Sequence, residues 1–307
     1  MYFRVLGPVE AWDGDIEIPI DGFKERTVLA ALLLSRNRVV TDAQLLDLLW
    51  GEDPPKTYAA QLYTYVSRLR KRFGGAVVIR RQHPGYALCV KSGELDADRF
   101  DQLDRKGHEL LKQGRHAEAA DTLGRALALW RGPALANVTE ALACAAAGRL
   151  EEARTAVLEG RIEADLVLGR HDRLVSELTG LVTQYPLRER FRAQLMIALY
   201  RSDRQGDAMA VYHDGCRILA EELGVDPGTA LRETYQYILV GSEPQRQPAG
   251  RSAAVSAGTV TVRLPLGARV ARRAEVPAQR VTDRQPAASL AVGVGVGLGI
   301  GLSGCPA

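Results

Sequence analysis

The stretch from Pro54 to Gly93 contains eight lysine and arginine side chains and no aspartate or glutamate. Its cations are Lys56, Arg68, Arg70, Lys71, Arg72, Arg80, Arg81 and Lys91. Long cationic side chains bind phosphate groups, and arginine can also donate to the edges of guanine bases. A solvated helix face is the alternative, but exposed helices normally mix charges of both signs. The one-signed window therefore indicates contact with a nucleic acid.

Two elements must position these cations. Apolar residues at helical spacing predict a helix over residues 57–73, and two short strands are predicted over 77–81 and 86–90. The buried stripe of the helix is expected to be Ala59, Leu62, Val66, Leu69 and Phe73. The two strands flank a turn at His83-Pro84-Gly85. A basic helix followed by a basic hairpin is typical of a winged helix-turn-helix.

The candidate DNA-binding residues follow from this arrangement. On the helix they are Gln61, Thr64, Tyr65, Arg68, Lys71 and Arg72, and on the hairpin Arg80, Arg81 and His83. Whether Gln61, Thr64 and Tyr65 read bases or bind phosphates stays open. For the hairpin, the alternative is an edge strand protected by charge. Arg70 lies toward the flank of the helix, where pairing with an acid is the alternative to DNA contact.

The residues ahead of the window predict a small sheet and two helices. Residues 2–12 and 16–20 alternate in polarity around Asp13-Gly14, a hairpin signal. Residues 23–36 have helical periodicity, and Thr41 with Gln44 forms a capping-box pattern that predicts a helix ending at Trp50. A rigid loop, Glu52-Asp53-Pro54-Pro55, then leads into the basic helix.

Residues 94–241 read as helical and mildly acidic. The periodicity predicts helices over about 97–113, 115–130, 138–168, 171–184, 187–202, 205–222 and 227–239. The Gly169-Arg-His-Asp and Asp203-Arg-Gln-Gly stretches lie one tetratricopeptide length, about 34 residues, apart. Ordinary core packing of helices is the alternative explanation for this spacing.

Composition narrows the classes of function. The four cysteines are scattered, which argues against a metal site or a disulfide framework and favours a reducing cytoplasm. Residues 242–307 are rich in proline and arginine and are expected to be disordered, and their apolar run 287–302 is broken by glycines and too short to span a membrane. We find no catalytic constellation and no phosphate-binding loop, so neither an enzyme nor a cofactor is expected.

Several stretches of the chain resemble one known family. They are Arg4-Val-Leu-Gly-Pro-Val9, Arg38-Val-Val-Thr41, Leu48-Leu-Trp-Gly-Glu-Asp-Pro-Pro55, Val66-Ser-Arg-Leu-Arg70, Pro84-Gly-Tyr86, Trp130-Arg-Gly-Pro133, Pro186-Leu-Arg-Glu-Arg190, Ala198-Leu-Tyr200 and Glu221-Glu-Leu-Gly-Val-Asp-Pro227. In this order they resemble the Streptomyces antibiotic regulatory proteins, activators of secondary-metabolite clusters. Larger members continue into an ATPase domain, which the glycine-rich end of this chain does not resemble.

The resemblance implies a fold and a set of partners. It implies an OmpR-type winged helix, with the 57–73 helix in the major groove and the 82–85 wing tip in a neighbouring minor groove. It implies binding to direct repeats in promoter DNA, oligomerisation there, and recruitment of RNA polymerase. The loop from Gly51 to Lys56 would touch polymerase through Glu52, Asp53 and Lys56.

The expected fold is mostly α with a small β part. Its expected divisions are a winged helix-turn-helix over 1–93, an all-α tetratricopeptide-like activation domain over 94–241 and a tail over 242–307. The preferred hypothesis is a cytoplasmic transcriptional activator of an antibiotic cluster. The alternative is a tetratricopeptide-like interaction scaffold with a basic docking module.

Overall fold

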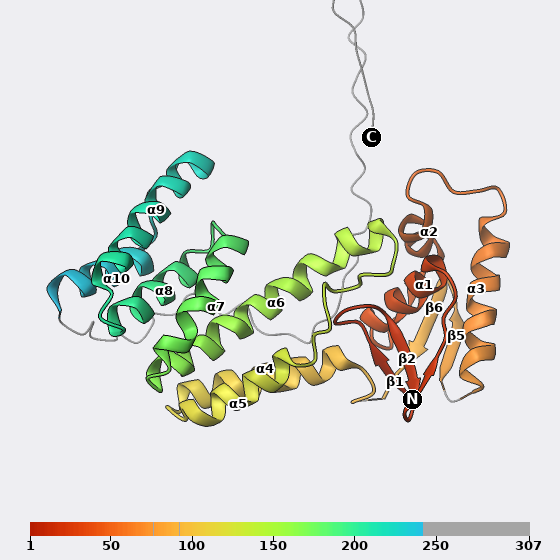
Figure 1. Ribbon diagram of the computed structural model, residues 1–307. Helices are drawn as coiled ribbons and strands as arrows, with labels where there is room; N and C mark the ends of the chain where they lie inside the picture. The colour runs from red at the N-terminus through yellow and green to blue at the C-terminus, as the bar shows by residue number, and fades with distance from the viewer. Residues whose placement is uncertain (76, 92, 242–307) are drawn as a thin grey trace, which may run out of the picture. The chain divides into compact units, whose positions relative to one another are not determined.

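The computed structural model describes residues 1–75, 77–91 and 93–241. Figure 1 traces the order of the helices and strands along the chain. The predictions made for the tail over 242–307 lie outside the described residues. Within the described ranges, no helix is long and apolar enough to cross a membrane.

The chain begins with a three-stranded antiparallel sheet, as the alternating polarity predicts. Strand β1 (Tyr2–Arg4) pairs with β2 (Glu10–Asp13), which pairs with β3 (Ile16–Ile18). Phe3 lies opposite Ala11 in the register, and both side chains are fully buried. Phe3 also packs edge-on against Phe73 at 5.6 Å between ring centroids, which ties the first sheet to the end of the basic helix.

Three helices follow the sheet: α1 (Phe23–Leu34), α2 (Asp42–Trp50) and α3 (Tyr58–Phe73). The capping box at the start of α2 is present, because Thr41 Oγ1 accepts from Gln44 N and Gln44 Oε1 accepts from Thr41 N. Helix α3 buries its predicted stripe from Leu62 onward. The prediction for Ala59 was wrong: its side chain is exposed, because the first turn of α3 lies beside a groove rather than over the core.

The predicted hairpin is present as β5 (Val78–Gln82) and β6 (Gly85–Cys89), and a short strand, β4 (Val40–Thr41), completes the sheet in the order β4-β6-β5. Thr41 lies opposite Gly85. A side chain at Gly85 would place its Cβ 1.8 Å from the carbonyl oxygen of Val40, so only glycine fits. The hairpin is therefore held against the start of α2.

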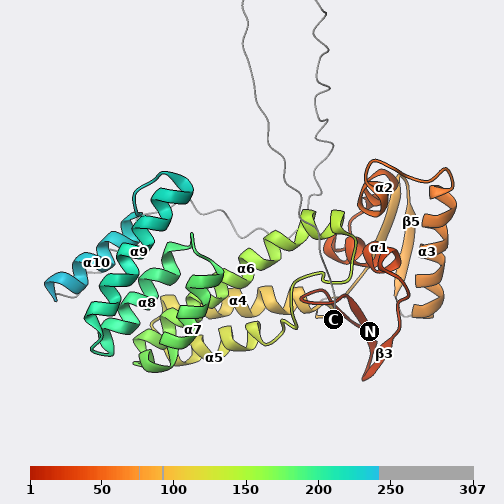
Figure 2. The same cartoon turned by 45° about the horizontal axis from the view of Figure 1, so that its top comes forward.

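Seven helices make up the remainder of the described chain. They are α4 (Asp96–Lys112), α5 (His116–Leu127), α6 (Glu140–Val167), α7 (His171–Gln184), α8 (Glu189–Arg201), α9 (Gln205–Leu223) and α10 (Thr229–Val240). Their order and bounds agree with the predicted ranges to within a few residues. Helices α4 and α5 lie side by side, as do α7 and α8, in both Figure 1 and Figure 2. Helices α7 and α9 begin 34 residues apart, as the repeated pattern predicts.

A buried seam joins the first sheet to α4. Asp96, the first residue of α4, accepts hydrogen bonds from the N–H groups of Val5 (2.9 Å) and Leu6 (3.0 Å). The N–H of Phe3 donates to the carbonyl of Glu94 at 2.7 Å. Residues 94–96 are thus bonded to the N-terminal sheet rather than forming a free linker.

The seam continues at the start of α6. Thr139, the N-cap of α6, donates from its hydroxyl to the carbonyl of Leu48 in α2 at 2.6 Å. Its N–H donates to the hydroxyl of Thr27 in α1 at 2.9 Å. Trp130 is buried and packs edge-on against Phe100. Because these contacts are buried, the elements up to β6 and the helices α4, α5 and α6 share one core.

Candidate nucleic-acid interface

The outward face of α3 carries both polar and cationic side chains. Tyr63, Thr64, Ser67, Arg68 and Lys71 are exposed along it. Arg68 and Lys71 make no ion pair or hydrogen bond with any residue that the structure describes. Thr64 donates its hydroxyl to the carbonyl of Ala60 at 2.8 Å, which leaves the hydroxyl oxygen free to accept. This face therefore offers two free cations and several short polar groups to a phosphate-rich surface.

Two other predicted residues lie at the edge of that face. Gln61 donates from Nε2 to the hydroxyl of Thr57, the residue that precedes α3, at 3.0 Å. Tyr65 is half-buried and packs its ring on Trp50, with 6.4 Å between centroids. The Lys24 ammonium lies 4.6 Å from the Trp50 ring on the other side. Tyr65 thus contributes to holding α3 on α2 as well as to its surface.

Arg72 is directed into the protein. Its Nε donates to Glu25 Oε1 at 3.0 Å, its Nη1 to the carbonyl of Pro19 at 2.7 Å, and its Nη2 to the carboxylate of Asp21. The side chain of Glu25 is only 1 % exposed. Burial raises the pKa of Glu25, while the neighbouring Arg72 guanidinium opposes that rise. Arg72 therefore anchors the C-terminal end of α3 to the beginning of α1.

The cations of the hairpin differ in their surroundings. Arg80 and His83 are exposed and have no hydrogen-bond or ion-pair partner within the described ranges. Arg81 forms a two-pronged ion pair with Asp42, at 2.6 and 2.7 Å, and its guanidinium lies 4.6 Å from the centre of the Tyr86 ring. Hydrogen bonding to Asp42 raises the pKa of Arg81. Arg70, on α3, pairs with no acid of residues 1–75, 77–91 and 93–241 and donates instead to the carbonyl of Ile79, at 3.0 and 2.8 Å.

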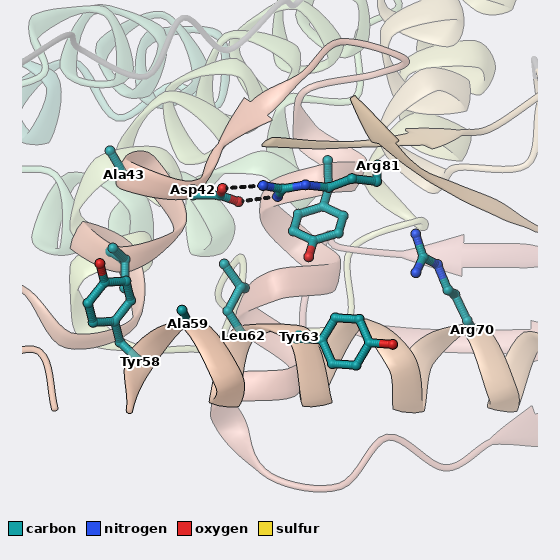
Figure 3. A pocket seen from close by; sticks show the side chains of 10 residues that line it. Asp42, Ala43, Tyr58, Ala59, Leu62, Tyr63, Arg70 and Arg81 are labelled. Atoms are coloured by element: carbon teal, nitrogen blue, oxygen red, sulfur yellow. Dashed lines mark hydrogen bonds and ion pairs between the residues drawn. The ribbon is translucent and has the colours of Figure 1, made fainter. Parts of the chain in front are cut away.

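A groove of about 610 Å³ lies between α3 on one side and the start of α2 with the hairpin on the other. Figure 3 shows Tyr58, Ala59, Leu62, Tyr63 and Arg70 rising from α3 along one side, with Asp42 and Arg81 joined across the other. On the far flank of α3, a second hollow is lined by Asp21, Arg68, Lys71 and Arg72. The exposed face of α3 is thus a ridge between two hollows.

The loop between α2 and α3 is exposed. Glu52, Asp53 and Lys56, predicted to touch polymerase, all face solvent. The loop begins at Gly51, whose φ of 62° terminates α2. Its ends are fixed by two helices that pack on the same core, so the loop is presented at the surface next to the α3 ridge.

The window was acid-free in sequence but is not acid-free in space. Asp21, Glu25 and Asp42 all lie outside residues 54–93, yet they pair with Arg72 or Arg81. Local sequence patterns single out neither these acids nor Tyr63, whose side chain is 62 % exposed. Helical spacing could have placed Tyr63 beside Ser67 and Lys71. Nothing in the local sequence indicates the pairing of Asp42 with Arg81, which are 39 residues apart.

Comparison with known families agrees with this geometry. The family model "Transcriptional regulatory protein, C terminal" matches residues 22–88, and the model "Bacterial transcriptional activator domain" matches residues 95–239. The regulatory protein DnrI of Streptomyces peucetius is 34 % identical over 250 residues, which cover 78 % of this chain and 92 % of DnrI. This chain belongs to the Streptomyces antibiotic regulatory protein family. The predicted family and the fold of a winged helix followed by a helical domain are confirmed.

Other members of the family are longer. The regulatory protein AfsR of Streptomyces griseus is 43 % identical over 251 residues, which are 82 % of this chain and 26 % of AfsR. This chain therefore spans about a quarter of the AfsR length. In the solved structure of Mycobacterium tuberculosis EmbR in complex with a low-affinity phosphopeptide, the shared fold has a TM-score of 0.75 at 34 % identity. It covers 79 % of this chain and 66 % of EmbR.

Proposed function

We propose that this protein is a DNA-binding transcriptional activator that controls genes of an antibiotic biosynthetic cluster. The main support for the proposal is the exposed ridge of α3, with a basic hairpin alongside. On this ridge Arg68 and Lys71 form no hydrogen bond or ion pair with the residues that the structure describes. Family membership supports the regulatory role, since its relatives include regulators such as DnrI and RedD. The proposed function involves no enzymatic activity and requires no cofactor. Its place of action is the cytoplasm, where bacterial promoters are.

The proposed contacts follow the geometry. Helix α3 enters the major groove, where Thr64, Arg68 and Lys71 meet bases and phosphates. The hairpin enters the next minor groove with Arg80, Arg81 and His83. Gln61 and Tyr65 lie at the rim of the contact. Arg72 contributes by fixing α3 rather than by touching DNA, because its three donors already have acceptors inside the protein.

The proposed partners include RNA polymerase and a second copy of the chain. The exposed loop with Glu52, Asp53 and Lys56 supplies the polymerase contact, and copies assemble on direct repeats in the promoter. We assign DNA binding to residues 1–93 and activation to residues 94–241. The hydrogen bonds of Asp96 and Thr139 across the seam fix the orientation of one part relative to the other.

Genome-wide footprinting of the intact protein would name the target promoters and the repeat spacing. On a promoter so identified, Arg68→Ala and Lys71→Ala should each weaken binding by about tenfold. Each should also reduce the slope of log affinity against log salt concentration by about one, as expected for the loss of one phosphate contact. Arg173→Ala is the matched control, since Arg173 is an exposed arginine on α7 without a partner among the described residues. Equal binding by all three variants would contradict the proposed face.

The alternative function is a protein-interaction scaffold. The 34-residue spacing of α7 and α9 favours it, because tetratricopeptide arrays commonly bind peptides. Truncation near residue 95 is a poor test, since it would strip Asp96 from the N–H groups of Val5 and Leu6. The double variant Arg68→Ala/Lys71→Ala separates the two. If the protein is a scaffold that needs no DNA, the double variant should still activate transcription in cells. If the protein activates by binding DNA, the double variant should lose this activity.

A further inference from the structure

The groove between α3 and the hairpin has a defined place in the proposed DNA complex. If α3 occupies a major groove and the hairpin the neighbouring minor groove, one sugar-phosphate strand separates the two elements, since adjacent grooves of a duplex share a strand. The protein surface between α3 and the hairpin must face that strand. The groove lined by Asp42, Tyr63, Arg70, Arg81 and Tyr86 is that surface. The inference that follows rests on the proposed function.

An acid in this position is unexpected. Asp42 is the only carboxylate that lines the described groove, and its side chain is 36 % exposed. A carboxylate facing a phosphate strand costs binding free energy through repulsion of like charges. Its charge is satisfied at present by Arg81, which is itself 47 % exposed on the hairpin. The pair therefore lies where solvent or a phosphate can reach both partners.

The position of Asp42 is fixed on the protein side. Asp42 is the first residue of α2, where the helix dipole and unpaired N–H groups favour a negative charge. Its own N–H donates to the carbonyl of Pro84 at the hairpin turn, at 3.0 Å. Thr41 and Gln44 close the capping box beside it. The carboxylate is thus held next to the hairpin whether or not Arg81 is bound.

The geometry of the pair resembles that of an arginine on a phosphate. Both terminal nitrogens of Arg81 donate to the two oxygens of Asp42, at 2.6 and 2.7 Å. A phosphate offers the same two-oxygen edge to a guanidinium. The Tyr86 ring lies under the guanidinium at 4.6 Å and keeps it at the mouth of the groove. Arg81 is therefore already aimed at the place where a phosphate of the passing strand would lie.

We propose that Asp42 is an internal substitute for a DNA phosphate, which holds Arg81 until a strand seated in the groove replaces it. The exchange trades one charge-assisted pair for another and leaves the Asp42 carboxylate facing the strand, so it gives little net affinity. It occurs only in complexes that seat the strand between α3 and the hairpin. Loosely bound duplexes leave Arg81 on Asp42, and the chain gains no phosphate contact from them. Asp42 thereby lowers non-specific binding and acts as a specificity-determining residue.

The test compares Asp42→Asn with Asp47→Asn in the full chain. Asp47 lies on the same helix and is exposed, so the charge change is matched, but it lies away from Arg81. Binding is measured over a salt series to the promoter duplex and to a random-sequence duplex. Asp42→Asn should tighten binding to the random duplex by about tenfold, with a salt slope steeper by about one, and tighten promoter binding less. Asp47→Asn should change neither by more than about twofold.

A second comparison places both substitutions in an Arg81→Ala background, where Asp42→Asn should lose its advantage over Asp47→Asn. Three results overturn the proposal: weaker DNA binding by Asp42→Asn, no change in the random-duplex affinity, or the same gain when Arg81 is absent. Thermal unfolding of each variant checks that the hairpin remains folded. If the wild-type protein binds no promoter fragment, both the proposed function and the exchange at Asp42 are wrong. If the wild type binds and Asp42→Asn changes no DNA affinity, only the exchange is wrong.

Discussion

At the scale of single residues, the cations of the basic window divide into bound and free groups. Arg72 and Arg81 have acidic partners, Arg70 is bonded to a backbone carbonyl, and Arg68 and Lys71 have no partner within the described ranges. The charge count alone treats all five alike. Position decides their roles, because a guanidinium with three internal acceptors contributes to folding and a free one remains available to phosphate.

Arg72→Ala and Arg68→Ala should therefore differ in their effect on stability. Removing Arg72 leaves the buried carboxylate of Glu25 without its cation, so the free energy of unfolding should fall by about 1–3 kcal/mol. Removing Arg68 should change it by less than about 0.5 kcal/mol, as for most exposed side chains. Urea denaturation of both variants measures the difference. Equal stabilities would show that the Glu25 contact contributes nothing to folding.

Asp96 should give the stability of the protein a pH dependence. Burial raises its pKa to about 6, although the N–H groups of Leu6, Val5 and Ala97 and the Arg131 guanidinium favour the carboxylate. An unfolded aspartate has a pKa of about 3.9, so between about pH 4 and 6 the folded protein binds more protons than the unfolded chain. The contribution of Asp96 to the free energy of unfolding thus falls as pH rises through this window, by at most about 1.4 kcal/mol per pH unit.

The matching measurement is urea denaturation of wild type and Asp96→Asn from about pH 4 to about pH 7. The stability difference between them should shift against the wild type as pH rises to about 6 and stay constant above it. The asparagine cannot titrate, so it subtracts the contributions of other carboxylates. A difference that does not vary with pH would place the pKa of Asp96 near its ordinary value.

At the scale of elements, the hairpin is a docked part of the winged helix. Strand β6 pairs with both β5 and β4, and Asp42 bonds the hairpin by its backbone and by its side chain. The close approach of Gly85 to Val40 makes this docking possible. The angle at which the hairpin leaves the core is consequently fixed by α2, the helix that also precedes the exposed 51–56 loop.

Gly85→Ala tests this docking. A Cβ at residue 85 would overlap the Val40 carbonyl, so the free energy of unfolding should fall by about 1–3 kcal/mol and DNA affinity should fall with it. Gly148→Ala is the control, because no atom lies within 4 Å of the added Cβ in α6. That helical substitution should stabilise the protein by about 0.5–1 kcal/mol. Thermal melts that rank the two variants the other way would argue against the docked arrangement.

At the scale of the whole described chain, the DNA-binding elements and the first activation helices form one structure. Asp96 and Thr139 reach back to residues 5–6, 27 and 48 through buried hydrogen bonds. Phe3, Trp130 and Leu142 belong to the same apolar core. A force or a ligand acting on α6 therefore acts directly on α2.

We expect the amides of Val5 and Leu6 to exchange hydrogen only when the whole unit unfolds. Both donate to Asp96 across the seam and both residues are fully buried, so local opening cannot release them. Native-state hydrogen exchange measures their opening free energy, which should equal that of the core amides of α1 and α5. Faster exchange at Val5 and Leu6 would mean that the N-terminal sheet separates from α4 before global unfolding.

The sequence predicts those features that depend on near neighbours. The capping box at Thr41, the buried stripe from Leu62 to Phe73 and the start of α7 after Gly169 all follow from patterns a few residues long, and each is present. The pairs Asp42–Arg81 and Asp21–Arg72 could not be predicted, because they join residues 39 and 51 positions apart. Packing of whole elements decides such pairs, and no local pattern records it.

The seam at Asp96 has a consequence for making chimaeras. The two family models meet between residues 88 and 95, which suggests a natural crossover point near 93. A crossover there would place a foreign strand β1 against the native Glu94, Asp96 and Arg131. The foreign residues at positions 3, 5 and 6 would then have to form the hydrogen bonds that Phe3, Val5 and Leu6 form with them. The bonds of α3 and the hairpin described above all end within the first 93 residues. An internal cassette that exchanges promoter choice must therefore carry Asp21, Glu25 and Asp42 together with α3 and the hairpin, with the first ten residues left in place.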